Sequence, residues 1–434
     1  MIIDFVFKNF RSFKDESTFT LKADSFKSKQ DNTFEIETVN GPVKLLKTAV
    51  IYGPNAGGKS NFIKALETFV LLIRYSPSFN SHENRIISYD PFELDINSQN
   101  SPVYFKISFF LEDYVRYDYE VSILKQRIAS ERLDFYPKGQ VANIFERVIK
   151  NDDEVDLIEL GKNLKGKRIP KKVFNNQLYL SKFGWEVPHD VLTPIYKYLS
   201  NIDVWMSHDK YRIDLVNKEI SMIIAQSESV KLKERLSKLI RISDTKIEGI
   251  SSKELKRNEF HLPKEIPEEI VDEIYEDNKI RTYSHHKIFD GTKEVDVKEF
   301  DFNQKESTGT KVLFALGGKI LQKLESGGIF VVDELDNSLH PKLCKFLIRL
   351  FNNKVSNPKN AQLIFATHEV TLLDKDVFRK DQIWFVEKNK YGSSEMYCAN
   401  EFEGVRDETN FEVWYRTGKF GGDPNIKEIE FIYE

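Results

Sequence analysis

The stretch "VIYGPNAGGKSNF", from Val50 to Phe62, decides the fold of this chain. It contains the pattern G-x-x-x-x-G-K-S, with Gly53, Gly58, Lys59 and Ser60 at the fixed positions. The apolar run "LLKTAVIY" before it is typical of a buried strand, and "NFIKALETFVLLI" after it is typical of an amphipathic helix. This order of strand, loop and helix is the context that a phosphate-binding loop requires.

The residue types of this loop suit a phosphate group. Glycines let backbone amides turn toward an anion, the helix N-terminus adds a partial positive charge, and Lys59 adds a full one. The hydroxyl of Ser60 would bind Mg²⁺. We therefore expect a nucleotide and Mg²⁺ at this loop, although no residue here visibly distinguishes ATP from GTP.

Two further apolar runs end in polar residues. "GGIFVVDELDNSLHP" passes into Asp333 and Glu334, and "AQLIFATHE" passes into Thr367 and His368. Each feature alone is more often structural, as an acidic turn or a satisfied histidine. In a parallel sheet, however, the carboxyl ends of the strands share one edge. We expect Asp333 to hold Mg²⁺ through water, Glu334 to polarise the attacking water, and His368 to contact the terminal phosphate.

A fourth stretch, "ESTGTKVLFALGGKILQKL", places Ser307, Thr308, Gly309 and Thr310 before a long helical pattern. One interpretation is a helix N-cap by Ser307 or Thr308. The other is a second anion site, made of hydroxyls, a glycine and a helix N-terminus. The spacing alone does not decide between them.

Composition excludes several classes of protein. The 434 residues carry 64 basic and 68 acidic side chains, so no global field demands nucleic acid or a membrane. Cys344 and Cys398 match no zinc or redox spacing, which suits a reducing compartment. No stretch approaches the roughly 20 apolar residues of a membrane helix. We expect a soluble, cytoplasmic protein with no membrane partner.

The patterns along the chain predict an α/β protein in three parts. Residues 1–150 hold the phosphate loop and an antiparallel β lobe, including a hairpin over Val103–Leu111 and Arg116–Leu124. Residues 151–300 are predicted to be an inserted, mainly helical lobe, as in the charged helical stretch Val216–Ile242. Residues 301–434 return to helices alternating with apolar strands, the pattern of a parallel sheet with crossover helices.

Together these motifs resemble the ABC-type ATPases, including the SMC and RecF group. "GPNAGGKS" corresponds to Walker A, "STGTK" to the signature, "VVDE" to Walker B and "TH" to the switch histidine. The resemblance implies an ABC-ATPase head that binds ATP and Mg²⁺ and closes as a homodimer over ATP. It implies catalytic roles for Lys59, Glu334 and His368, and metal ligation by Ser60 and Asp333. The implied nucleotide contacts are Gly53, Asn55, Gly57, Gly58, Lys59, Ser60, Asn61 and Arg11, with Ser307 and Gly309 acting from the second subunit.

More narrowly, the chain looks like the stand-alone bacterial ATPases typified by RloA and by the ATPase subunit of the PARIS antiphage system. The stretches that carry this resemblance include "FKNFRSF", "DELDNSLHP", "NAQLIFATHEVTLLD" and "YRTGKFGGDPNI". It implies a sensor or scaffold in antiphage defence that controls a separate effector, a nuclease, and responds to a phage trigger protein or DNA. Only 66 residues follow His368 in the chain, and we expect no nuclease domain in them.

The sequence departs from the family pattern in two places. SMC and transporter heads close the D-loop with an aspartate, and this chain has His340 at that position. The ending "LHP" that contains this histidine is shared with the OLD-type ATPases. No glutamine is identified as that of the Q-loop. The alternatives are an SMC or RecF type DNA repair and maintenance ATPase that binds duplex directly, and, more weakly, a transporter subunit.

Two minor features have competing interpretations. The basic run "KNLKGKRIPKK", Lys162–Lys172, is either a solvated loop or a contact for DNA or an acidic trigger protein. His285 and His286 are neighbours in a predicted strand. Because adjacent strand residues point to opposite faces, a shared metal is not expected there.

Overall fold

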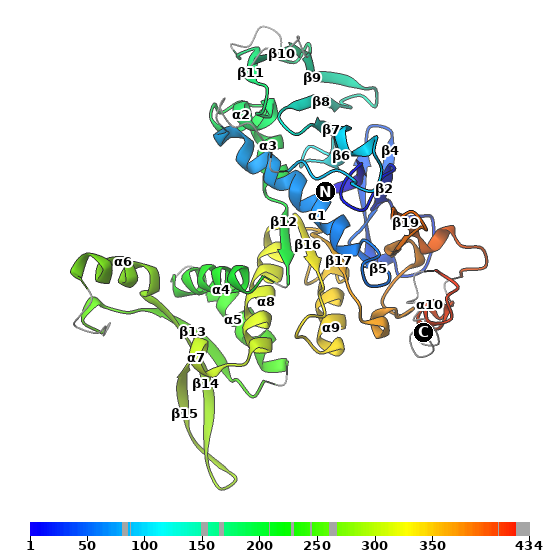
Figure 1. Cartoon of the computed structure of the whole chain (residues 1–434). Coiled ribbons are helices and arrows are strands. Elements are labelled where there is room, and N and C mark those ends of the chain that lie inside the picture. The colour runs from blue at the N-terminus through cyan, green and yellow to red at the C-terminus, as the bar shows by residue number, and fades with distance from the viewer. Residues whose placement is uncertain are drawn as a thin grey trace, which may run out of the picture. The chain divides into compact units, whose positions relative to one another are not determined.

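A computed structural model of the chain describes residues 1–79, 86, 88–148, 155–164, 169–207, 209–226, 230–243, 245–259, 267–406 and 408–421. The chain divides into two compact units (Figure 1). Unit 1 comprises Met1–Trp205, Gly327–Leu335 and Ile348–Glu434, and unit 2 comprises Met206–Ser326 and Asp336–Leu347. Segments distant in sequence therefore build each unit.

A six-stranded sheet lies at the centre of unit 1. Its order is β12 (Asp203–Met206), β16 (Ile329–Asp333), β17 (Gln362–Ala366), β5 (Thr48–Tyr52), β18 (Ile383–Lys388) and β19 (Ser394–Cys398). Strands β16, β17, β5 and β18 run parallel, and β19 is antiparallel to β18. All residues of β5, β16 and β17 are buried, which explains their unbroken apolar sequences. The prediction that these three strands are parallel members of one sheet is thereby confirmed.

The helix predicted after the phosphate loop is α1 (Lys59–Tyr75). Its buried apolar residues recur every three or four positions, from Phe62 to Ile73. Phe62 packs on Phe19 with ring centroids 5.0 Å apart, and Phe69 packs on Phe5 at 5.9 Å. Burial of these aromatic rings fixes α1, and with it the end of the phosphate loop, against the N-terminal strands.

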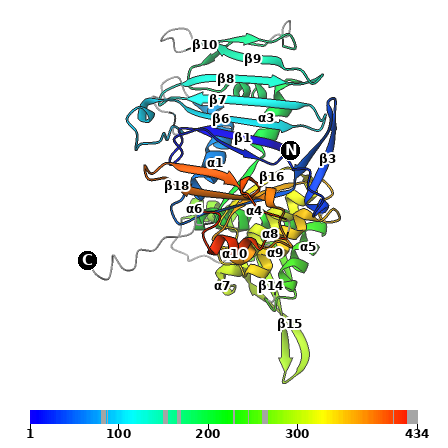
Figure 2. The same ribbon diagram turned by 90° about the vertical axis from the view of Figure 1, so that its right-hand side faces the viewer.

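The N-terminal lobe is an eight-stranded antiparallel sheet, whose strands lie side by side in Figure 2. Its order is β11 (Lys172–Phe174), β10 (Val155–Leu160), β9 (Ala142–Val148), β8 (Ile128–Phe135), β7 (Arg116–Ile123), β6 (Val103–Phe110), β1 (Ile2–Lys8) and β2 (Ser17–Thr20). The predicted hairpin is confirmed as β6 and β7, paired from Val103 opposite Ile123 to Phe110 opposite Arg116. A small separate sheet pairs β3 (Thr33–Thr38) with β4 (Gly41–Leu46).

The stretch after residue 154 does not begin the inserted lobe as the sequence pattern predicted. Strands β10 and β11 extend the antiparallel sheet, and the helices α2 (Tyr179–Trp185) and α3 (Leu192–Ser200) also belong to unit 1. The physical reason is a buried charge network, in which Arg147 bonds to Glu131 at 3.1 Å and to Asp156 at 2.7 Å. A charged residue, Asp156, therefore occupies one buried position of β10 beside the buried Ile158 and Leu160, so the apolar pattern of this strand is incomplete.

Unit 2 contains the helices α4 (Lys210–Ala225), α5 (Val230–Ile242), α6 (Glu268–Asn278), α7 (Phe302–Lys305) and α8 (Thr308–Ser326). The charged stretch Val216–Ile242, predicted to be helical, falls on α4 and α5, whereas α8 was predicted in the C-terminal part of the head and belongs to unit 2 instead. Helix α9 (Pro341–Asn352) crosses the unit boundary. A β-carbon at Gly317 would lie 2.5 Å from Leu239, and one at Gly318 would lie 2.8 Å from Ile220. These two glycines thus allow α8 to pack closely on α5 and α4.

Unit 2 also carries a three-stranded sheet of β13 (Gly249–Glu254), β14 (Ile280–Asp290) and β15 (Lys293–Asp301), so it is not wholly helical. His285 and His286 lie in β14 as predicted and have different partners. His285 Nε2 is 2.8 Å from Ser251 Oγ, and His286 Nε2 is 2.8 Å from Glu306 Oε1. The predicted mixed α/β class, with a parallel sheet and an antiparallel lobe, is confirmed.

Two findings bear on the class of protein. Cys344 and Cys398 are buried free thiols, and burial raises the pKa of the Cys398 thiol far above its usual range. Across the described part of the chain, no helix has the length and apolar character to cross a membrane.

Candidate active site

The phosphate loop turns sharply between β5 and α1. Gly58 has a φ of +129°, and a β-carbon there would lie 2.5 Å from Ser394 Oγ. A β-carbon at Gly53 would lie 2.0 Å from the carbonyl oxygen of Val386. Strands β18 and β19 therefore press on the loop at both glycines, and only glycine leaves room for that contact.

Lys59 lies across this loop. Its side chain is buried, and Nζ donates to the carbonyl oxygens of Gly53, at 2.7 Å, and Pro54, at 3.1 Å. Gly58 occupies the N-cap position of α1 and offers no side chain to the first-turn amides. The loop thus combines an ammonium group with an uncapped helix N-terminus, which is the composition of a phosphate site.

The carboxyl ends of the three predicted strands are joined by backbone hydrogen bonds. The amide of Leu335 donates to the Ala366 carbonyl at 3.1 Å, and the amide of Thr367 donates to the Ile51 carbonyl at 3.2 Å. These bonds bring the residues after β16, β17 and β5 to one edge of the sheet. The arrangement expected for Asp333, Glu334 and His368 beside the phosphate loop is therefore present.

Asp333 and Glu334 differ in environment. Asp333 is only 1% exposed, whereas the side chain of Glu334 is 22% exposed. Glu334 also has a φ of +54°, a left-handed conformation that costs a non-glycine residue about 1–2 kcal/mol. Its Oε1 lies 3.8 Å from Nε2 of His368. A strained, partly exposed carboxylate next to an imidazole is a suitable geometry for activating water.

The donor set at this edge suits Mg²⁺. Ser60, in the first turn of α1, supplies a hydroxyl, and Asp333 supplies a carboxylate. Oxygen ligands of this kind are preferred by Mg²⁺, which usually takes its remaining ligands from phosphates and water. Over the described ranges, no group of three or more His, Cys, Asp or Glu side chains gathers as a metal site. A nucleotide would have to complete the coordination.

Arg11 and Asn61 form a hydrogen-bond network next to the phosphate loop. Arg11 Nε donates to Asp90 Oδ2 at 2.7 Å, and its Nη1 donates to Asn61 Oδ1 at 3.3 Å. Asn61 Nδ2 in turn donates to Ser12 Oγ at 2.7 Å. Arg11 itself has a φ of +50°, so its backbone conformation is as unusual as that of Glu334.

The same network continues to the phosphate loop through a residue that the sequence did not identify. Ser394, on β19, has its Oγ 2.8 Å from Ser12 Oγ and donates to the Gly57 carbonyl at 2.6 Å. The Ser394 amide donates to the Ser12 carbonyl. No motif surrounds Ser394, and only its contact with Gly57 reveals its role.

We expect Ser394→Ala to loosen the phosphate loop, because it leaves the buried Gly57 carbonyl without this donor. The expected loss is about 1–3 kcal/mol of unfolding free energy, together with a several-fold weaker affinity for ATP. Chemical denaturation and nucleotide titration measure the two effects. Glu395→Ala, at the exposed next position of β19, is the matched control and should change neither quantity. Unchanged ATP affinity in Ser394→Ala would contradict the bracing role.

The signature residues lie in unit 2. Ser307 Oγ accepts from the Thr310 amide at 3.2 Å, so Ser307 does act as a helix cap. A β-carbon at Gly309 would lie 2.9 Å from the carbonyl of Ser338, which explains the glycine by close packing. The structure thus assigns both residues a local role, and their contact with a nucleotide remains a prediction.

His340 has a structural role of the same kind. Its Nδ1 accepts from the amide of Lys342 at 3.1 Å, next to the start of α9. An imidazole that binds this amide satisfies one of the free donors at the helix N-terminus. The departure from aspartate at this position is therefore compatible with a normally capped helix.

Residues 165–168, in the middle of the basic run Lys162–Lys172, lie outside the described residues.

A cavity of about 240 Å³ opens beside the phosphate loop. It is lined by Gly53, Pro54, Asn55, His368, Val370, Tyr415 and Arg416. The predicted residues Gly53, Asn55 and His368 therefore face one space. Tyr415 and Arg416, from α10 (Phe411–Arg416), were not predicted as site residues.

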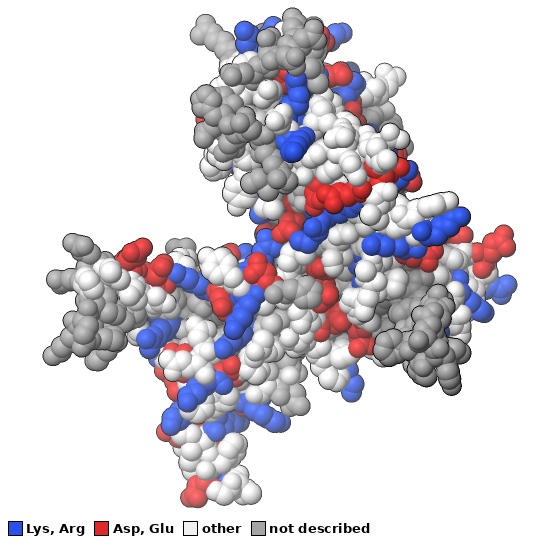
Figure 3. Space-filling view, viewed as in Figure 1, with Lys and Arg blue, Asp and Glu red and all other residues white. Residues whose placement is uncertain are grey.

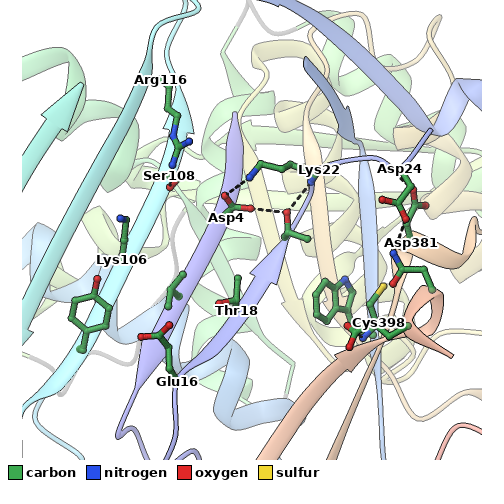
Figure 4. A pocket seen from close by; sticks show the side chains of 16 residues that line it. Asp4, Glu16, Thr18, Lys22, Asp24, Lys106, Ser108, Arg116, Asp381 and Cys398 are labelled. Carbon is green, nitrogen blue, oxygen red and sulfur yellow. Dashed lines mark hydrogen bonds and ion pairs between the residues drawn. The ribbon is translucent and has the colours of Figure 1, made fainter. Parts of the chain in front are cut away.

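A larger cavity, of about 670 Å³, lies along β1, β2, β6 and the segment around Asp381 (Figure 4). Its lining mixes acidic side chains with Lys22, Lys106 and Arg116, and part of this set is paired internally. Lys22 Nζ is 2.9 Å from Asp4 Oδ2, and Asp381 Oδ2 accepts from the amide of Asp24. None of the predicted site residues lines it. It therefore carries no argument for nucleotide binding.

The chain was compared with solved structures, with curated proteins and with protein families. Among solved structures, the SMC head domain from Thermotoga maritima matches with a TM-score of 0.41 and 13% sequence identity, over 92% of this chain and 98% of that one. No curated protein matches the sequence. Residues 49–374 match the family described as "AAA domain, putative AbiEii toxin, Type IV TA system". That region runs from β5 through the phosphate loop to the segment after His368, and the chain belongs to this family of P-loop ATPases.

Proposed function

We propose that the protein binds and hydrolyses ATP, and that it acts as the sensor or scaffold of a bacterial antiphage defence system. The observation that supports ATP hydrolysis best is the common edge formed by the phosphate loop, Asp333 with Glu334, and His368. A phosphate loop alone only binds nucleotide. A carboxylate placed to activate water adds a means of hydrolysis.

Each residue has a distinct part in the proposed reaction. Lys59 leaves the carbonyl oxygens of Gly53 and Pro54 and turns its ammonium group to the phosphates. Ser60 and Asp333 would hold Mg²⁺, which would neutralise charge on the phosphates. Glu334 accepts a proton from the attacking water. His368, 3.8 Å from Glu334, orients that water or contacts the terminal phosphate.

We further propose that ATP closes two copies of the chain together. In ABC-type heads, which the chain resembles, the signature of one subunit covers the ATP of the other, and Ser307 and Gly309 would take this position. Their position at the start of the 19-residue helix α8 would direct a helix N-terminus toward the phosphates. ATP would then favour the closed dimer because only that form completes the site.

A separate effector protein, a nuclease, is proposed to respond to this closure. The resemblance to stand-alone defence ATPases supports such a partner. A phage trigger protein or DNA would change the equilibrium between open and closed forms. The proposed location is the cytoplasm.

Direct binding of duplex DNA, as in SMC or RecF heads, is less well supported. On the face drawn in Figure 3, Lys and Arg side chains alternate with Asp and Glu. On this face, such mixing does not form the basic patch or stripe that is typical of a nucleic-acid interface.

Native mass spectrometry of Glu334→Gln protein, isolated from its host with ATP and Mg²⁺, tests the proposal. This variant should hold ATP and accumulate the closed form. A homo-oligomer that carries a second protein is expected and would identify the effector. A homodimer that retains DNA instead would replace the sensor function with direct DNA binding. The double variant Lys59→Ala, Glu334→Gln is the control, and it should remain monomeric.

A further inference from the structure

The C-terminal helix α10 is fixed beside the phosphate loop by aromatic packing. The ring of Tyr415 stacks on Phe385 of β18, with centroids 5.7 Å apart and planes at 14°. It also contacts Tyr52 at 5.8 Å. Tyr52 is the last residue of β5 and directly precedes Gly53. The C-terminal end of α10 is thus packed against the strand that leads into the loop.

The segment after α10 strengthens this attachment. Phe420 stacks on Phe385 with ring centroids 4.7 Å apart, and its carbonyl accepts from the hydroxyl of Tyr397 at 2.8 Å. Tyr415 is only 5% exposed. Residue 416 therefore follows a buried anchor, and its position relative to the loop does not depend on a loose tail.

Arg416 brings a positive charge to the cavity at the front of the loop. Of the described residues that line that cavity, Arg416 is the only arginine or lysine. The cavity is bounded by Gly53, Asn55 and His368. In this class of motif the loop amides cradle the α- and β-phosphates, and the lysine reaches the β- and γ-phosphates. His368, which is proposed to contact the terminal phosphate, lines the same cavity as Arg416, so the terminal phosphate would lie within reach of this arginine.

The guanidinium is available for a stronger partner. Its Nε bonds to Glu412 Oε1 at 3.1 Å, and the side chain of Arg416 is 56% exposed. An exposed pair of this kind, one helical turn apart, stabilises little. A phosphate offers two oxygens to the planar guanidinium, so exchange of Glu412 for a phosphate is favourable.

We infer that Arg416 contacts the terminal phosphate of ATP bound in the same subunit, and that it makes the site prefer ATP to ADP. This inference rests on the proposed function. It also gives the C-terminal segment a role: departure of the terminal phosphate would return Arg416 to Glu412. The nucleotide state would thus be communicated to α10.

Equilibrium binding of a non-hydrolysable ATP analogue and of ADP, with Mg²⁺, tests the inference. Arg416→Ala is expected to weaken binding of the analogue by about 10-fold to 100-fold, the range for a hydrogen bond to a charged group, and to change ADP binding by less than about twofold. Arg416→Lys should fall between, because it keeps the charge and loses the paired geometry. Glu412→Gln should strengthen binding of the analogue, since it releases Arg416.

Lys419→Ala is the matched control. Lys419 lies in the same segment, with Nζ 4.6 Å from the ring centre of Trp414, and does not line the cavity. It should bind both nucleotides like the wild type. Equal weakening of ATP analogue and ADP in Arg416→Ala, or wild-type affinity for both, would overturn the inference while leaving the proposed ATPase intact. If the wild-type protein bound neither nucleotide, the proposed function and this inference would both fail.

Discussion

Lys59→Ala is expected to abolish measurable ATP binding. The ammonium group is the full positive charge of the phosphate loop, and a methyl group in its place leaves the phosphates with backbone amides alone. Charge-assisted hydrogen bonds to phosphate are the strongest contacts available here, so a loss of at least about 100-fold in affinity is expected. Nucleotide titration by calorimetry or fluorescence measures the loss.

Lys59→Ala should also alter the protein without nucleotide. Lys59 joins the carbonyl oxygens of Gly53 and Pro54, so its removal loosens the free loop. ATP should no longer raise the melting temperature of this variant. Lys64→Ala, one turn further along α1, is the control and should retain the ATP-dependent increase. An increase of wild-type size in Lys59→Ala would remove the assignment of this loop as the phosphate site.

Glu334→Gln is expected to retain ATP binding and to lower the turnover rate by about 100-fold to 10,000-fold, the usual contribution of a general base. Glutamine keeps the shape of the side chain but cannot accept the proton of the attacking water. The left-handed conformation at this position, with φ at +54°, is equally strained in both proteins. The difference in rate therefore reports the carboxylate itself.

Phosphate release under saturating ATP, measured alongside ATP affinity, separates these effects. Glu403→Gln, an exposed acidic residue of unit 1, is the control for the loss of one negative charge. It should turn over at the wild-type rate. Equal turnover by Glu334→Gln and the wild type would exclude Glu334 as the base and would direct attention to the remaining polar groups at this edge.

The arrangement of the phosphate loop, Asp333, Glu334 and His368 was predictable from the sequence for a specific reason. Strands buried on both faces read as short, continuous apolar runs, so β5, β16 and β17 are visible without an alignment. Parallel strands also place their carboxyl ends along one edge. Polar residues that follow such runs must therefore lie near one another.

The bounds of the inserted lobe were harder to predict from the sequence. Strand β10 and its neighbours hold Glu131, Arg147 and Asp156 in the interior, where pairing compensates for burial of the charges. In β10 the buried positions carry Asp156 together with Ile158 and Leu160, so the apolar alternation that marks a strand is interrupted. The buried network, and not the local propensity of residues 155–174, attaches them to the antiparallel sheet.

The sequence by itself determined the phosphate-loop motif, the parallel strands and the residues at their ends, because these depend on local pattern and on the geometry common to all parallel sheets. Only the tertiary structure decided the supports of the site. Ser394 meets Gly57, and Arg416 meets the front of the loop, across more than 300 residues of chain. Contacts of this kind depend on how side chains fill the space between distant elements, and no periodicity in the sequence records that packing.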